Sequence, residues 1–243
     1  PWAFARTIAT ADVTLNVSAG NSIQAAVNSL LNDYDFADHF GYIQLADGTY
    51  TESVSIPRQP LGQNQIIIRG NANDYGAVQW KAPAGQNCCS VQNGGIGIFA
   101  YTEFSAPNGG GLITTRQGGS VANVVSCRLG AATVQLSATL GSTINCNGYH
   151  VIMAGATTCL EATLGGNILI SWSALNINSA CTYTYFAKAV GSGSNISFGG
   201  VVYQGASVTG GQGLVANNAV IDRGGTTIPG STAVVVQNGG QLL

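Results

Sequence analysis

Apolar residues recur at helical spacing in one stretch near the N-terminus. The spacing i, i+3, i+4, i+7, i+8 and i+11 is followed by Ile23, Ala26, Val27, Leu30, Leu31 and Tyr34. Residues at this spacing share one face of an α-helix, and Asn21 or Ser22 is placed to cap its start. We predict a single amphipathic helix that covers one end of a hydrophobic core.

Around this helix, apolar and polar residues alternate with the period of β-strands. The pattern predicts strands at Val13–Val17, on both sides of a turn at Asp47-Gly48, and at Ile66–Ile68, followed by a loop over 71–76. Parallel neighbours in a sheet normally need a crossover of a dozen or more residues. Because the loop is so short, we expect successive strands to lie on different faces and not to pair with each other.

A repeat with a solenoid period begins after residue 90. It is visible in "GGIGIFA", "GGSVANV", "GSTINCN", "GGNILIS" and "GSNISFG", whose aligned apolar positions are Ile98, Val121, Ile144, Ile168 and Ile196. The steps are 23, 23, 24 and 28 residues, and "VVQNGGQLL" at the C-terminus resembles a truncated last unit. Periods of 20–50 residues are typical of solenoids, and the units lack helical patterns. We therefore predict an all-β parallel β-helix over 42–243, continuous with a strand and capping helix over 1–41.

The composition restricts the classes of partner. Of 243 residues only 7% are charged and 34 are glycine, so the surface must consist largely of uncharged polar side chains. The net charge of −2 provides no basic stripe for nucleic acid, and no apolar run is long enough to predict insertion into a membrane. No signal peptide is visible. The six cysteines are expected to be reduced and buried as small apolar side chains.

Two resemblances follow from these motifs. "SIQAAV", "GTYTES" and "IIIRGN" resemble the opening of pectin-lyase-like right-handed β-helices, which implies a right-handed coil. Together with "IQLADGTYTE", "GYHVIMAGATTCLEATLGGNILIS" and "NGGQLL", they are similar to β-helical proteins of tailed phages and prophages. This resemblance implies a trimeric tail spike or fibre, some of which recognise or cleave surface glycans.

Few residues in the chain are candidates for catalysis. Glu161 and Asp222 are the only carboxylates after residue 103, and on a shared face they would lie about 10–12 Å apart along the axis. That separation slightly exceeds the range for glycan hydrolysis. Glu52 is expected to point outward from the first coil, and the catalytic motifs of pectinesterases, pectate lyases and polygalacturonases have no counterpart. We therefore lean against an enzyme.

Cofactor and metal chemistry is also disfavoured. Cys127, Cys146, Cys159 and His150 lack the close ligand spacing of a zinc site. We expect the cysteines to form a column inside the solenoid and His150 to lie on a turn. No cofactor and no metal are predicted.

Aromatic residues gather in "SWSALNINSACTYTYFAK" (171–188). Tyr183 and Tyr185 are expected on one strand face, with Trp172 nearby. Outward aromatic rings can bind sugars or pack between subunits. Subunit packing, glycan contact and incidental exposure all remain open for Trp172, Tyr183 and Tyr185.

The sequence thus favours a structural or receptor-binding component of a phage tail. Its expected partners are sister chains in a homotrimer, other virion proteins and a host surface polysaccharide. The expected location is the virion, after assembly in the host cytoplasm. A polysaccharide lyase or hydrolase of the pectin-lyase-like class and a bacterial surface adhesin are the alternatives.

Overall fold

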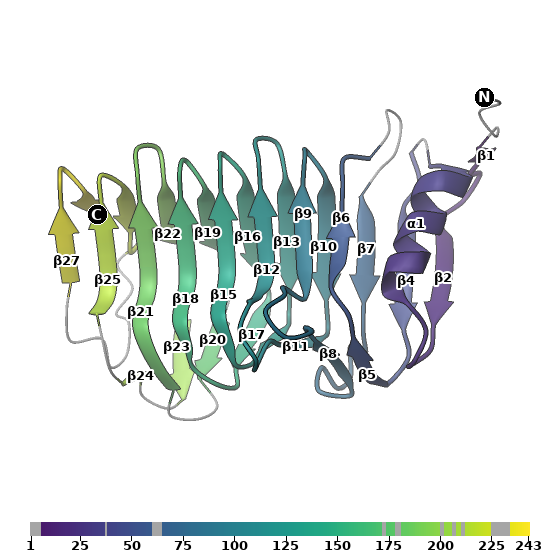
Figure 1. The fold of residues 1–243 in the computed structure, drawn as a ribbon, viewed down its shortest axis with the longest axis horizontal. Coiled ribbons are helices and arrows are strands. Elements are labelled where there is room, and N and C mark those ends of the chain that lie inside the picture. The colour runs from purple at the N-terminus through teal and green to yellow at the C-terminus, as the bar shows by residue number, and fades with distance from the viewer. Residues whose placement is uncertain are drawn as a thin grey trace.

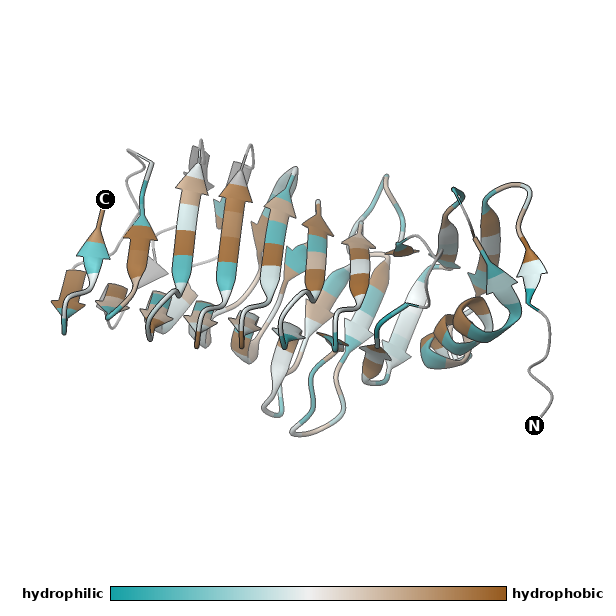
Figure 2. Cartoon of the chain, turned by 90° about the horizontal axis from the view of Figure 1, so that it is seen from above, coloured by the Kyte–Doolittle hydropathy of each residue, from teal (hydrophilic) through white to brown (hydrophobic). Residues whose placement is uncertain are grey.

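The chain winds into a parallel β-solenoid, an elongated rod with strands on three sides (Figure 1). The computed structural model describes residues 6–36, 38–59, 65–171, 174–177, 181–199, 202–205, 208–209, 212–224 and 234–243. Throughout these ranges the paired strands are parallel, and each pairs with strands one coil away. The predicted parallel β-helix is confirmed. In Figure 2, hydrophobic and hydrophilic positions alternate along many of its strands.

Three long sheets form the sides of the rod. Sheet 1 consists of β2 (Val13–Val17), β4 (Gly41–Leu45), β7 (Ile66–Arg69), β10 (Ile96–Ala100), β13 (Val121–Val125), β16 (Thr143–Asn147), β19 (Asn167–Ser171), β22 (Asn195–Gly199), β26 (Val220–Asp222) and β28 (Gln241–Leu242). Sheet 2 consists of β5 (Gly48–Thr51), β8 (Val78–Lys81), β11 (Glu103–Ser105), β14 (Arg128–Leu129), β17 (Tyr149–Ile152), β20 (Ala174–Ile177) and β23 (Val202–Gly205).

Sheet 3 contains the longest strands. It consists of β6 (Val54–Ile56), β9 (Cys89–Gln92), β12 (Gly111–Arg116), β15 (Ala132–Thr139), β18 (Ala156–Thr163), β21 (Cys181–Val190), β25 (Gln212–Asn217) and β27 (Val234–Gln237), with β24 (Val208–Thr209) also paired to β21. A coil runs through sheets 1, 2 and 3 in that order. The short 71–76 loop suffices because it only carries the chain from sheet 1 to sheet 2.

The interior consists of side-chain columns, one residue per coil. Ile144, Ile168 and Ile196 occupy one such column and are fully buried, as the repeat predicted. The predicted equivalence of Ile98 and Val121 to this column is wrong, because Ile98 pairs with Asn123 and Val121 with Thr143. Both side chains are partly exposed.

Glycine and alanine take the inward position in those two coils. Gly97 pairs with Ala122, and Ala122 pairs with Ile144. A Cβ on Gly97 would lie 2.8 Å from Cδ1 of Ile56 and 3.3 Å from the Phe99 ring. The large Phe99 ring therefore fills space that isoleucine takes in later coils. Because the inward residues Gly97 and Ala122 are small, the sequence alignment placed their larger apolar neighbours Ile98 and Val121 in the column instead.

One helix covers the N-terminal end of the rod. It is α1 (Ile23–Asp33), which lies beside β2 and β4 (Figure 1) and also contacts β6. Ser22 is its N-cap, and its hydroxyl accepts a hydrogen bond from Ala25 N at 3.1 Å. Ile23, Val27, Leu30 and Leu31 are buried, so the predicted amphipathic face is confirmed.

The helix ends one residue before the predicted limit. Tyr34 begins β3 (Tyr34–Asp35), which pairs with β1 (Thr7–Ile8). Across the described residues, no helix has the length and apolarity needed to span a membrane.

Candidate functional site

The three predicted aromatic residues have different positions. Trp172 lies outside the described residues. Tyr183 is only 2% exposed, and its hydroxyl donates to Oε1 of Gln135 at 3.2 Å. Its burial raises the pKa of the Tyr183 phenol. A glycan or second subunit cannot contact a ring inside the solenoid, so the surface role predicted for Tyr183 is wrong.

Tyr185 keeps the surface role as a prediction. It is partly exposed, and the Lys188 ammonium lies 5.2 Å from its ring centroid. The two tyrosines differ in exposure where the strand bends. Thr184 is exposed and Tyr185 is partly exposed, and the next two residues, Phe186 and Ala187, are both buried. The alternation of sides therefore breaks after Tyr183, and β21 is visibly curved in Figure 1.

The two late carboxylates do not form a catalytic pair. Glu161 belongs to β18 in sheet 3, whereas Asp222 ends β26 in sheet 1. They therefore lie on different sides of the rod, which contradicts the geometry considered for hydrolysis. Glu161 accepts a hydrogen bond from Lys188 Nζ at 3.2 Å, and this ion pair satisfies the carboxylate.

The cysteines are buried in the solenoid, as predicted. All six are unpaired by disulfides and buried. Burial raises the pKa of Cys88, Cys127 and Cys159 to about 12, which suppresses the reactive thiolate.

His150 corrects the expectation of a turn position. It lies within β17 and is 2% exposed. Its Nδ1 accepts a hydrogen bond from Cys127 N at 3.3 Å, and burial lowers the pKa of His150 to about 4. In the described part of the chain no group of three metal-ligating side chains is close enough to hold an ion.

Glu52 joins the first coil to the helix. It lies between β5 and β6 and accepts hydrogen bonds from Ser22 Oγ at 3.0 Å, Ile23 N at 2.5 Å and Gln24 N at 3.2 Å. A carboxylate at a helix N-terminus is favoured by the free N–H groups and the helix dipole. The prediction of a merely outward residue is corrected, because Glu52 caps α1.

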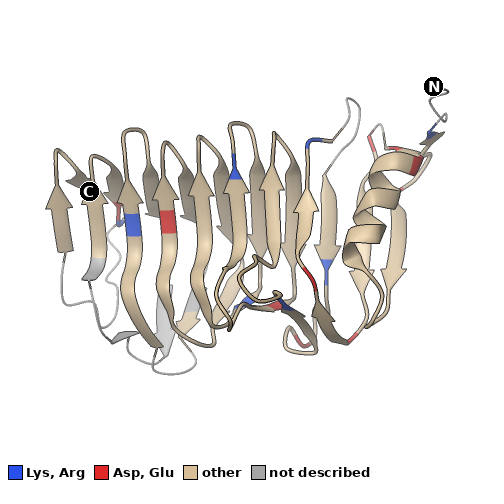
Figure 3. Ribbon diagram, in the orientation of Figure 1, with Lys and Arg blue, Asp and Glu red and all other residues tan. Residues whose placement is uncertain are grey.

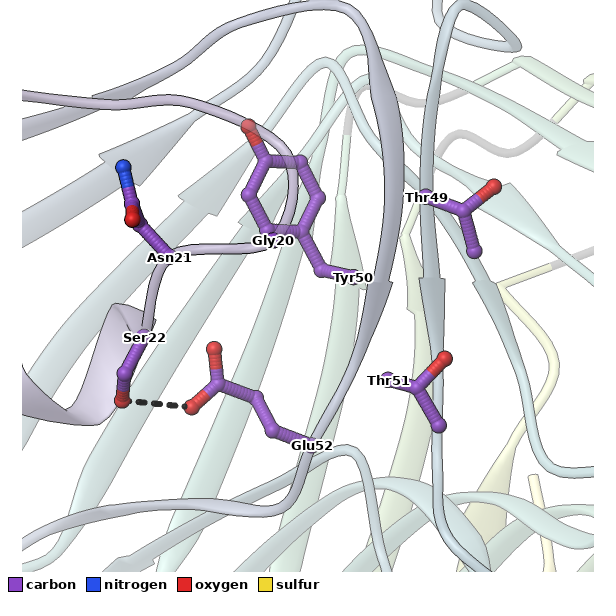
Figure 4. A pocket seen from close by; sticks show the side chains of 7 residues that line it. All are labelled: Gly20, Asn21, Ser22, Thr49, Tyr50, Thr51 and Glu52. Atoms are coloured by element: carbon purple, nitrogen blue, oxygen red, sulfur yellow. Dashed lines mark hydrogen bonds between the residues drawn. The ribbon is translucent and has the colours of Figure 1, made fainter.

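A hollow of about 490 Å³ surrounds this cap (Figure 4). It is lined by Gly20, Asn21, Ser22, Thr49, Tyr50, Thr51 and Glu52. The Glu52 carboxylate points toward Ser22 in Figure 4, where helix capping occupies it. We therefore assign this hollow to the structure of the N-terminal cap.

A second group of polar and aromatic side chains lies where sheet 1 turns into sheet 2. We call it the corner site, and it comprises Gln44, Asp47, Arg69, Asn71, Asp74, Tyr75, Tyr101, Arg128 and Tyr149. Five successive coils contribute, because these residues lie at or beside the turns that follow β4, β7, β10, β13 and β16. Figure 3 shows few charged residues on the strands and a small group of both signs near β8 and β11.

The loop over 71–76 is the centre of the corner site, and it is braced by its own side chains. Asn71 Oδ1 accepts hydrogen bonds from Asn73 N at 3.0 Å and Asp74 N at 3.3 Å. Asn71 Nδ2 donates to Oδ1 of Asp47 at 3.0 Å, which ties the loop to the preceding coil. A loop held in this way presents its side chains without a further ordering cost.

Two hollows flank the loop. The first, of about 340 Å³, is lined by Gln44, Leu45, Asp47, Arg69, Gly70, Asn71, Ala72 and Tyr101. The second, of about 250 Å³, is lined by Ala72, Asn73, Asp74, Tyr75, Arg128, Tyr149 and Val151. Ala72 lines both, so the hollows adjoin each other across the loop.

Aromatic rings border both hollows. The Tyr75 and Tyr101 ring centroids are 5.6 Å apart, and Tyr149 is 38% exposed. The Tyr149 hydroxyl accepts a hydrogen bond from Asn176 Nδ2 at 2.5 Å, which leaves its own proton to donate elsewhere. Partly exposed rings with polar groups beside them can bind both the apolar face and the hydroxyl groups of a sugar.

The backbone turns at Tyr101 in a way that recurs at other corners of the solenoid. Tyr101 has φ +57°, a left-handed conformation that costs roughly 1–2 kcal/mol for a residue with a side chain. The equivalent corners of the next two coils use Ser126 and Gly148, also at positive φ. Leu140 and Leu164 at other corners are also at positive φ, so this conformation belongs to the turns of the solenoid.

Ion pairs hold the second hollow together. Arg128 lies 3.4 Å from Asp74 Oδ1 and 3.6 Å from Glu103 Oε2. A Cβ on Gly76 would lie 2.0 Å from Arg128 Nη1, so only glycine at this position lets the guanidinium lie against the loop. The Arg128 charge is thus offset by two carboxylates.

Sequence reasoning missed the corner site because its members share no motif. They are distant in sequence and belong to different coils. A usable signal existed only after the repeat had been recognised: Tyr75, Tyr101, Arg128 and Tyr149 follow one another at roughly one coil length. Comparison with known proteins identifies no matching family model, curated protein or solved structure.

Proposed function

We propose that this protein is a β-helical tail component of a tailed phage that binds a surface glycan of the host through the corner site. The observation that carries the binding role is the grouping of Tyr75, Tyr101 and Tyr149 around two adjoining polar hollows. The phage assignment is supported by the short motifs that resemble phage tail proteins and by the solenoid fold.

The shape of the site suits an extended ligand. The two hollows lie on either side of a braced loop and take residues from five successive coils, which are spaced by about 4.8 Å each. An oligosaccharide lying along the rod would cover both hollows. Every carboxylate in the corner site already has a partner, in Asn71 for Asp47 and in Arg128 for Asp74. Binding, rather than cleavage, therefore fits this geometry better.

The test is a binding screen against bacterial surface polysaccharides, followed by variants measured with the polysaccharide that binds. Tyr75→Ala and Tyr149→Ala should each weaken binding about tenfold or more, which corresponds to about 1.4 kcal/mol. Tyr185→Ala tests the remaining aromatic candidate, on sheet 3, and should leave the affinity unchanged if the corner site alone binds the glycan. Loss of binding with Tyr185→Ala alone would relocate the site, and no binding to any polysaccharide would refute the proposal.

Tyr101→Asn separates a structural effect from a binding effect. Asparagine tolerates positive φ better than tyrosine, so the variant should be at least as stable as the parent protein. It loses the ring that packs on Tyr75 and should bind the same polysaccharide more weakly. Unchanged affinity in this variant would count against the aromatic site.

We also propose a homotrimer that contacts other virion proteins. The native mass measured by light scattering during size-exclusion chromatography should equal three chains of 24.7 kDa. A clean monomer would contradict the trimer.

A further inference from the structure

We infer that the first hollow of the corner site contains an oxyanion subsite built on Arg69, which binds a carboxylate or phosphodiester group of the glycan. This inference rests on the proposed glycan binding and specifies the chemistry of one part of that ligand. It concerns only the hollow bordered by Gln44, Asp47, Arg69 and Tyr101.

Arg69 is held in place from two directions. Its Nε donates to Oε1 of Gln44 at 2.8 Å, and its guanidinium carbon lies 4.5 Å from the Tyr42 ring centroid. Gln44 is itself fixed, because its Nε2 donates to the carbonyl oxygen of Gly70 at 2.9 Å. The amide oxygen of Gln44 is thereby directed at Arg69.

The terminal nitrogens of Arg69 remain available. Among the described residues, neither Nη atom donates a hydrogen bond or forms an ion pair, although the side chain lines the hollow. Two Nη groups in one plane match two oxygens of a carboxylate or phosphate. A guanidinium already ordered by Gln44 and Tyr42 loses little further conformational freedom on binding.

Arg128, the other arginine of the corner site, has a structural role. Arg128 is paired with Asp74 and Glu103, so its charge has partners within the protein. Arg69 is positioned by a neutral amide and an aromatic ring instead. Neither contact neutralises the charge of Arg69, so an anionic group of the ligand can pair with it.

Asp47 limits the charge that the subsite accepts. Its carboxylate lines the same hollow and is hydrogen-bonded to Asn71 Nδ2 at 3.0 and 3.3 Å. A ligand with several adjacent negative charges would be repelled by Asp47. A single oxyanion that approaches from the side of Arg69 is therefore the expected ligand group.

The experiment uses the complete chain and three matched probes: methyl glucoside, methyl glucuronide and the methyl phosphodiester of glucose. Affinity is measured by NMR titration, with the Arg69 Nε–Hε signal assigned by its loss in Arg69→Gln. One or both anionic probes should bind about tenfold more tightly than methyl glucoside and should shift the Arg69 signal. Whichever anionic probe binds more tightly shows whether the glycan group is a carboxylate or a phosphodiester.

Variants make the assignment specific. Arg69→Gln should bring the affinity of the anionic probe down to that of methyl glucoside. Arg116→Gln, which changes an exposed arginine at the end of β12, should leave the preference intact. Equal affinity for the three probes, or a preference that survives Arg69→Gln, would overturn the oxyanion subsite.

The outcomes also separate this inference from the proposed function. Equal binding of all three probes that is weakened by Tyr75→Ala would refute the oxyanion subsite and leave glycan binding standing. Failure of all three probes to bind would count against both.

Discussion

The contact between Glu52 and the helix leads to a quantitative prediction. Glu52→Ala removes the acceptor for Ile23 N, Gln24 N and the Ser22 hydroxyl. Loss of an N-terminal cap typically costs about 1 kcal/mol, and loss of a negative charge at a helix N-terminus costs up to about 1 kcal/mol more. Ser22 still accepts from Ala25 N, so part of the capping remains. We expect the free energy for opening the helix to fall by about 2 kcal/mol.

Hydrogen exchange is the suitable measurement because it reports on the helix alone. A solenoid with nearest-neighbour contacts can open one region without unfolding the rest. A loss of 2 kcal/mol should speed the exchange of the Val27 and Leu30 amides about thirtyfold, because 1.4 kcal/mol corresponds to tenfold. Glu52→Gln keeps one acceptor oxygen and should give a smaller increase.

Helix exchange in two variants tests this role of Glu52. If helix amides in Glu52→Ala exchange within twofold of the parent rate, the carboxylate does not hold the helix to the first coil. Glu103→Gln removes a carboxylate from sheet 2, far from α1 in the fold, and should leave helix exchange unchanged. An equal increase in that variant would indicate a general loss of stability.

Two further predictions follow from buried titratable groups. Burial holds the pKa of His150 at about 4, against 6.5 for a free histidine, so between these pH values the unfolded chain binds a proton that the folded protein does not. Stability should therefore fall as pH drops from 6.5 to 4, by up to about 1.4 kcal/mol per pH unit. In urea unfolding at pH 7 and pH 5, His150→Leu should show a weaker fall, and an identical fall would contradict this role. Burial of all six cysteines predicts that they react with a disulfide reagent at pH 8 at least about a hundredfold more slowly in the native protein than in guanidinium. Rapid reaction of several thiols without denaturant would show that the core is accessible.

The parts of the fold that depend on local pattern could be predicted from the sequence. The spacing of Ile23, Val27, Leu30 and Leu31 identified the helix, and Ser22 was among its two expected caps. The repeat of small turns and apolar runs identified the solenoid, because each coil must bury a similar set of side chains next to its neighbour.

Positions that depend on packing across coils could not be read from pattern alone. Ile98 and Val121 were placed inward because they are apolar, yet Gly97 and Ala122 take that place beside the large Phe99 ring. Tyr183 was placed outward because aromatic residues often form surfaces, yet Gln135 two coils earlier gives its hydroxyl a buried partner. In both cases the deciding contact comes from another residue of the core.

The corner site could not be predicted because it is made by stacking. Asn71, Tyr101 and Arg128 belong to three coils, and nothing in any one of these segments indicates that the others lie beside it. Only the register of β7, β10 and β13 brings their turns together. The left-handed backbone at Tyr101 is likewise a property of the folded corner.

The parallel register has a mechanical consequence for the corner site. Among the described residues, the strands from β19 onward lie one strand spacing further along the rod with each coil and line neither hollow around the 71–76 loop. They set the distance between the corner site and the C-terminal end of the rod in steps of about 4.8 Å. Deleting or inserting one whole coil there would change that distance by one step while the geometry of the corner site stayed constant.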